Sequence, residues 1–274
     1  MTNSGHPLPH DVSAEVDRIA HQQRIEVFLA SRDAGNTLTL DSLRAGIRLE
    51  TVISAAADAA QYADEAIGIV RDEYRPVLHC KEGCSYCCCK PGVLTTVPEL
   101  LRILDHVQST FRPDAVSALS ERAKRYASQI EGHSFDDPTD ESVPCPLLVD
   151  GRCSVYEVRP LVCRGYNSTD VDACRKAHED ADELVPIFSV IKDVTDGATV
   201  GIAERLKEAG FNDSLVDLGS ALNIALAGGD SFSADILDGG TALLPAENST
   251  WVRNLSDRVH ETARQIGFVS ERKK

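Results

Sequence analysis

CKEGCSYCCC, residues 80–89, holds five of the nine cysteines in the chain. The other four are Cys145, Cys153, Cys163 and Cys174. Thiolate ligands converge on a metal at about 2.3 Å, and spacings of two or three residues let one turn of chain supply several of them. Because every cysteine lies within residues 80–174, the clustering predicts a local metal site rather than scattered buried thiols.

Residues 80–89, called here the first cysteine segment, fit two local geometries. In a helix its thiols would share one face except that of Cys89, which makes Cys89 the weakest ligand candidate. Gly83 is equally typical of a looped turn, in which backbone N–H groups approach the sulfurs and stabilise their charge. Both geometries gather the same thiols.

Composition and charge limit the classes of partner. The 274 residues are enough for one large domain or two small ones with a substantial core, so the cysteines do not compensate for a small core. The net charge of −15 repels phosphate backbones and anionic membranes, and the basic cluster at residues 272–274 is a short tail. We therefore expect no nucleic-acid and no membrane partner, and leave a protein or small-molecule partner open.

The chain also lacks an apolar signal for export or membrane insertion. Residues 1–10 contain no secretory signal core, and the longest apolar stretch, residues 184–191, is shorter than the roughly 20 residues that span a bilayer. We expect a cytoplasmic protein. Clustered cysteines in that reducing compartment favour metal ligands or redox groups over disulfides.

Hydrophobic periodicity predicts helices through most of the chain. The expected helices cover residues 11–30 (ending near Gly35), 52–74 (stopped by Pro76), a stretch capped by Thr96 and Glu99, 113–130, a stretch from about 170, 200–209, 215–226 and 251–266. Asp150-Gly151 between two short apolar runs predicts a tight β-hairpin.

These patterns predict a mainly α fold, in which a helical domain has a cysteine-rich metal-binding core containing a short β-hairpin. Three regions follow from the cysteine distribution. They are an N-terminal helical segment (1–78), a cysteine-cluster metal-binding region (79–180) and a C-terminal helical region (181–274).

Two families share cysteine spacings with the chain. Cys80-x3-Cys84-x-Tyr86-Cys87 resembles the four-iron cluster motif of radical S-adenosylmethionine enzymes, but those are strand and helix repeats with a downstream Gly-Gly-Glu element. The more specific match uses Cys84-x2-Cys87-Cys88, then Cys145-Pro146, then GRCSVYEVRPLVCR at residues 151–164. It resembles the YkgJ-like cysteine-cluster family, described as zinc- or iron-chelating.

That resemblance implies a metal-ligand set and leaves two cysteines outside the pattern, Cys89 and Cys174. The implied ligands are Cys80, Cys84, Cys87, Cys88, Cys145, Cys153 and Cys163. Flagellin lysine N-methylases carry a similar cluster, but this chain has no Gly-rich methyl-donor loop. Catalytic and cofactor-binding residues are not identified.

Seven thiols exceed the four that one tetrahedral zinc ion or one four-iron cluster needs, so either two centres share the region or three thiols act otherwise. We favour an iron–sulfur cluster, of the 4Fe–4S kind, or iron, serving redox or metal-dependent modification chemistry; zinc is the alternative metal. A zinc-stabilised protein-interaction module without catalysis and a protein-modifying methyltransferase are the alternative functions.

Other polar groups near the cysteines receive weaker interpretations. His79 is expected to be a partly exposed neighbour, and His178 a member of a solvated helix face that we leave out of the site. Arg159 and Arg164 lie close enough in sequence to offset thiolate charge.

Overall fold

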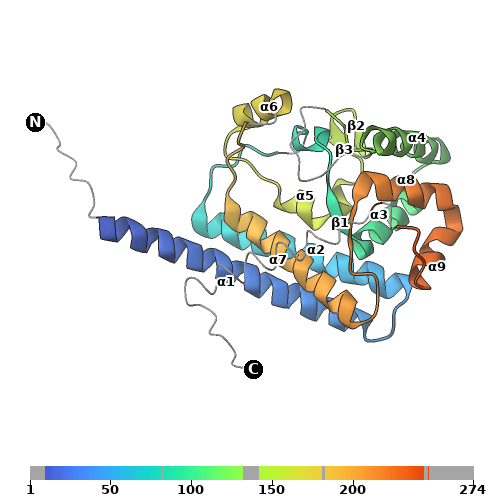
Figure 1. The fold of residues 1–274 in the computed structure, drawn as a ribbon, viewed down its shortest axis with the longest axis horizontal. Coiled ribbons are helices and arrows are strands. Elements are labelled where there is room, and N and C mark those ends of the chain that lie inside the picture. Colours follow the sequence, from blue (N-terminus) through green and yellow to red (C-terminus); the bar gives the residue numbers. More distant parts are fainter. Residues whose placement is uncertain (1–9, 82, 132–141, 181–182, 244–245, 247–274) are drawn as a thin grey trace, which may run out of the picture.

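The computed structural model describes residues 10–81, 83–131, 142–180, 183–243 and 246, and within them the protein is mainly α-helical, as predicted (Figure 1). The helices are α1 (His10–Leu43), α2 (Leu49–Tyr74), α3 (Val97–Thr110), α4 (Pro113–Gln129), α5 (Leu161–Gly165), α6 (Val171–Glu179), α7 (Ser189–Glu208), α8 (Leu218–Gly228) and α9 (Phe232–Leu237). The strands are β1 (Leu94–Thr96), β2 (Leu148–Val149), β3 (Arg152–Cys153) and β4 (Leu215–Asp217). Three short 3₁₀ turns are η1 (Cys87–Cys89), η2 (Tyr156–Val158) and η3 (Gly229–Ser231). None of the described helices is both long and apolar enough to cross a bilayer.

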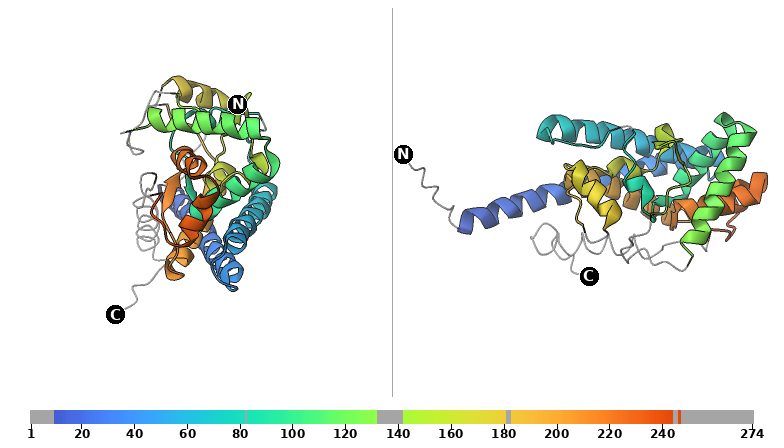
Figure 2. Two further views of the ribbon diagram at one scale, coloured as in Figure 1. Left: turned by 90° about the vertical axis from the view of Figure 1, so that its right-hand side faces the viewer. Right: turned by 90° about the horizontal axis from the view of Figure 1, so that it is seen from above.

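Helices α1 and α7 form a closely packed pair (Figure 1). The prediction that the first helix ends near Gly35 is wrong, because α1 continues to Leu43. A Cβ at Gly35 would overlap the backbone of Ala198 on α7, and a Cβ at Gly201 would overlap the carbonyl of Arg32 on α1. These glycines therefore permit close helix contact, and the first turns of α1 extend past the neighbouring elements (Figure 2).

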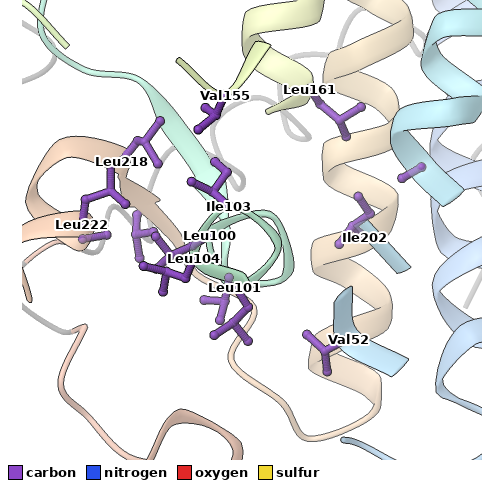
Figure 3. Close-up of a cluster of buried hydrophobic side chains, with 14 of the residues drawn as sticks. Val52, Leu100, Leu101, Ile103, Leu104, Val155, Leu161, Ile202, Leu218 and Leu222 are labelled. Carbon is purple, nitrogen blue, oxygen red and sulfur yellow. The ribbon is translucent and has the colours of Figure 1, made fainter. Parts of the chain in front are cut away.

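Helix α2 ends, and helix α3 begins, where the sequence predicts. Arg75, before Pro76, ends α2 with a left-handed φ of 46°. Thr96 and Glu99 form the predicted capping box at the start of α3. Figure 3 shows Leu100 and Leu104 of α3 beside Leu218 and Leu222 of α8 in the hydrophobic core.

A small antiparallel sheet, β1 with β4, follows the first cysteine segment and was not predicted. Leu94 pairs with Asp217, and Thr96 with Leu215. The helix predicted from Leu215 therefore begins only at Leu218, and the Asp217 side chain caps it by accepting from the Ser220 N–H at 2.8 Å. Three-residue strands are too short to show a period in the sequence.

The predicted hairpin is confirmed. Strands β2 and β3 pair antiparallel, with Leu148 opposite Cys153. Asp150 and Gly151 both have positive φ, 50° and 73°, as a two-residue turn of this hand requires.

The three predicted regions contribute to one hydrophobic cluster, which includes Val52, Leu161 and Leu222. Their boundaries stay a prediction. The helix predicted at residues 251–266 lies outside the described residues.

Candidate metal centre

The first cysteine segment is a loop that ends in a 3₁₀ turn, rather than a continuous helix. The Cys84 N–H donates to the Lys81 carbonyl, and the Cys88 N–H donates to the Ser85 carbonyl, each at 3.0 Å. Gly83 has a φ of 85°, which glycine adopts readily. Of the two geometries that the sequence allowed, the looped turn is therefore the observed one.

Backbone hydrogen bonds attach the segment around Cys145 to this loop. The Cys145 N–H donates to the Cys88 carbonyl at 2.8 Å, and the Val143 N–H donates to the Cys89 carbonyl at 3.0 Å. Cys145 precedes β2, outside the strand, as its flanking prolines predict. Residues separated by more than fifty positions thus lie side by side.

Cys163 is carried by the short helix α5, which a buried carboxylate anchors. The Leu161 N–H, at the start of α5, donates to Oε1 of Glu99 at 2.6 Å. The other carboxylate oxygen, Oε2, accepts from the Thr96 N–H and hydroxyl, both at 2.8 Å. Glu99 therefore joins the first turn of α3 to the element that presents Cys163.

Arg164 fixes the opposite side of α5. Its guanidinium donates to the carbonyls of Arg159 and Glu157, at 3.1 and 2.8 Å, and forms an ion pair with Asp64 of α2. The Arg164 side chain is only 4% exposed, so this pairing compensates a buried charge. Arg164 thus holds the chain between β3 and α5 in place.

Four thiols, those of Cys88, Cys145, Cys153 and Cys163, share one neighbourhood and are called here the inner thiol group. The pKa of Cys145 is raised to about 12, mainly by burial and to a smaller extent by the thiolates of Cys88 and Cys153. Burial also raises the pKa of Cys153, with a contribution from Cys88. The pKa of Cys163 is raised well above its ordinary value by burial and then by all three partners. Every pair within the group therefore interacts.

Cys88 differs from its three partners in acidity. The Cys87 thiol forms a side-chain hydrogen bond with Cys88, and this lowers the pKa of Cys88 to about 7 while it raises that of Cys87. Metal ligation requires deprotonated thiols. Cys88 is thus the thiol of the group that loses its proton most readily.

A cavity of about 370 Å³ lies between the first cysteine segment, α5, α6 and α7, and none of the four inner thiols lines it. Cys80, Cys84 and Cys87 line it from the first cysteine segment, and Cys174 and His178 line it from α6. The wall also includes residues of α5 and α7 and the segments beside them, namely Val162, Gly165, Tyr166, Lys192, Thr195 and Asp196. Cys174 and His178 were not predicted as site residues, although their spacing of four residues on a predicted helix indicates a shared face.

The neighbouring polar groups have distinct roles. The His79 Nδ1 accepts from the Val171 N–H at 3.1 Å, so His79 ties the start of α6 to the first cysteine segment. Arg159 lies over the ring of Tyr156, 3.8 Å from its centroid, and its charge acts to lower the pKa of Cys153. Of the two arginines expected to offset thiolate charge, Arg159 does so, whereas Arg164 is paired with Asp64.

All nine cysteines are free thiols. Among the residues that the structure describes, no group of three or more His, Cys, Asp or Glu side chains has the close spacing that holds a metal ion directly. The donor chemistry nevertheless fits, because all-thiolate sets select zinc or iron–sulfur clusters. A cation would also offset the charge that four deprotonated, partly buried thiols bring together.

Comparison with known families agrees with this chemistry. Residues 79–182 match the family model described as "CxxCxxCC: Putative zinc- or iron-chelating domain". This region is similar to that cysteine-cluster family. The resemblance predicted from the motifs is therefore confirmed, and the match supports zinc or iron chelation by residues 79–182. No curated protein and no solved structure matches the chain.

Proposed function

We propose that the inner thiol group holds an iron–sulfur cluster, and that the protein serves redox or metal-dependent modification chemistry. The observation that carries the proposal is that each of the four thiols interacts with the other three. Four thiolates are the ligand number that a four-iron cluster needs. Such a cluster, when bound, would supply electron transfer or substrate activation.

The residues of this chain would control the environment of that centre. Glu99 and Arg164 fix α5 and hence Cys163, while the hairpin turn fixes Cys153. Backbone N–H groups and Arg159 lie near the sulfurs, where they favour the thiolate form. Partial burial of all four thiols limits access of water to the centre.

The first test is the metal and acid-labile sulfide content of protein purified without oxygen, with a visible spectrum before and after chemical reduction. Iron with sulfide and a reversible loss of visible absorbance would support the proposal. Zinc without sulfide would contradict it and favour the zinc-stabilised interaction module.

The second test locates the centre with two variants of the same chemistry. Cys153→Ser removes one thiol of the inner group and should abolish binding at that centre. Cys89→Ser, in the same loop as Cys88 but outside the inner group, should retain it. Equal metal content in both variants would contradict the assignment.

A further inference from the structure

We propose that Cys80, Cys84, Cys174 and Nδ1 of His178 form a second site, separate from the inner thiol group, for a divalent metal of the zinc class. These four residues line the same cavity from two sides. Two come from the first cysteine segment and two from α6. The site includes a cysteine and a histidine that the family pattern does not contain.

The spacing on α6 suits a metal site. Cys174 and His178 are four positions apart in a nine-residue helix, so their side chains lie on one face. Cys80 and Cys84 have the same separation in the loop that faces them. Two such pairs supply three thiolates and one imidazole, a donor set typical of structural zinc sites.

His178 has an unexplained nitrogen that points to a ligand. Its Nδ1 is buried, and it has no hydrogen-bond partner among the described residues. A buried polar atom without a partner is unfavourable, and a metal ion bound at this position would remove that cost. The His178 ring also lies near Tyr86 of the first cysteine segment, with 6.2 Å between ring centroids, so α6 and this segment pack against each other.

Two contacts dock α6 against the loop. The His79 N–H donates to the Ser168 carbonyl at 2.8 Å, and the Val171 N–H donates to Nδ1 of His79 at 3.1 Å. Cys80 and Cys84 of the loop and Cys174 of α6 line one cavity. The sulfurs of loop and helix are therefore neighbours.

The two sites are distinguishable by their partners. Cys80, Cys84 and Cys174 line the cavity, whereas no thiol of the inner group does. Cys87 lies between the sites, since it lines the cavity and forms a side-chain hydrogen bond with Cys88 of the inner group. Division into two sites accounts for thiols in excess of the four that one centre needs.

Four donors complete the coordination of one ion in closed structural zinc sites, and these four side chains would close around the ion when it binds. Its role would be to hold α6 against the first cysteine segment and so to form one wall of the cavity. The second site does not depend on the identity of the metal in the inner group.

The test is a titration of the metal-free full chain with Co²⁺, whose visible spectrum reports tetrahedral thiolate binding. Wild type should bind two equivalents, and the Cys174→Ser/His178→Ala double variant should bind one. Cys84→Ser, which changes the loop instead of the helix, should lose the same equivalent. Cys89→Ser is the matched control and should bind two.

Hydrogen exchange gives a second readout. Amides of residues 171–179 should exchange faster in the metal-free protein and in the double variant, while those of α3 should not change. A double variant that binds as much Co²⁺ as wild type would overturn the second site. If Cys153→Ser loses one equivalent and the double variant loses none, the second site is overturned and the inner site is supported. If the double variant loses one equivalent and Cys153→Ser loses none, only the inner site is overturned.

Discussion

Replacement of Glu99 by Gln should destabilise the protein by interrupting the link between α3 and α5. The Glu99 side chain is almost fully buried, with the residue only 5% exposed. One carboxylate oxygen accepts from the Thr96 N–H at 2.8 Å, and the other accepts from the Leu161 N–H at 2.6 Å. Glutamine has only one acceptor oxygen, so one of these two N–H groups must face an amide NH₂.

The expected loss follows from the number of buried donors that lose their acceptor. Thr96 and Leu161 are each 1% exposed, so water does not replace the carboxylate. One unsatisfied buried donor costs about 1–3 kcal/mol, which sets the effect of Glu99→Gln at about 2 kcal/mol. Glu99→Ala removes the acceptor of both N–H groups and of the Thr95 and Thr96 hydroxyls, and should cost at least twice as much, or at least about 4 kcal/mol.

Urea unfolding of the metal-free protein measures this difference in the free energy of unfolding. Glu121→Gln, at an exposed position of α4, makes the same chemical change without a buried partner and should stay within about 0.5 kcal/mol of wild type. If Glu99→Gln is also within about 0.5 kcal/mol of wild type, Glu99 does not join the two helices.

Two further changes test the helix contact and a buried carboxyl. Gly201→Ala should cost about 1–3 kcal/mol in urea unfolding because its Cβ overlaps the Arg32 carbonyl, whereas Gly68→Ala, with open space around it, should stabilise α2; effects of the same sign would contradict the packing argument. Burial raises the pKa of Asp217 above 3.8, so the folded protein retains a proton there that the unfolded chain releases. The free energy of unfolding should therefore fall as pH rises from 3.8 towards the folded value. Asp217→Asn should reduce this dependence of the free energy of unfolding on pH. An unchanged pH dependence would refute its assignment to the Asp217 carboxyl.

Long periodic elements could be predicted from the sequence, because hydrophobic spacing and capping are local properties. The capping box at Thr96 and the stop at Pro76 are both observed where the sequence places them. The predicted helix end near Gly35 is wrong because a glycine that ends a helix and a glycine that allows close helix contact cannot be distinguished in the sequence. Only the neighbouring backbone of Ala198 distinguishes them.

Most of the donor residues of the candidate site could be predicted from the sequence, but which of them lie together could not. Cysteine spacing and the family motifs identify the thiols of the first segment, but not which of them join Cys145 and Cys163. That grouping depends on the hydrogen bond between Cys145 and Cys88 and on the docking of α5 by Glu99, both between residues distant in sequence. His178 was left out because its helix is rich in charge, and its burial follows from the docking of α6.

The long helices form the hydrophobic core and the short elements carry the inner thiols, and this difference indicates what role a bound metal would have. The inner thiols lie on a 3₁₀ turn, the loop before β2, a two-residue strand and a five-residue helix, none of which is stable alone. Side chains such as Glu99 and Tyr126, on α3 and α4, hold these pieces through hydrogen bonds to Leu161 and Gly92. The main hydrophobic cluster is built from the long helices, with Cys145 and Cys153 only at its edge. Because the helices can bury their apolar faces without the thiols, metal binding is not needed as the main source of folding energy. This favours a centre held for its chemistry over an ion held only to fold the chain.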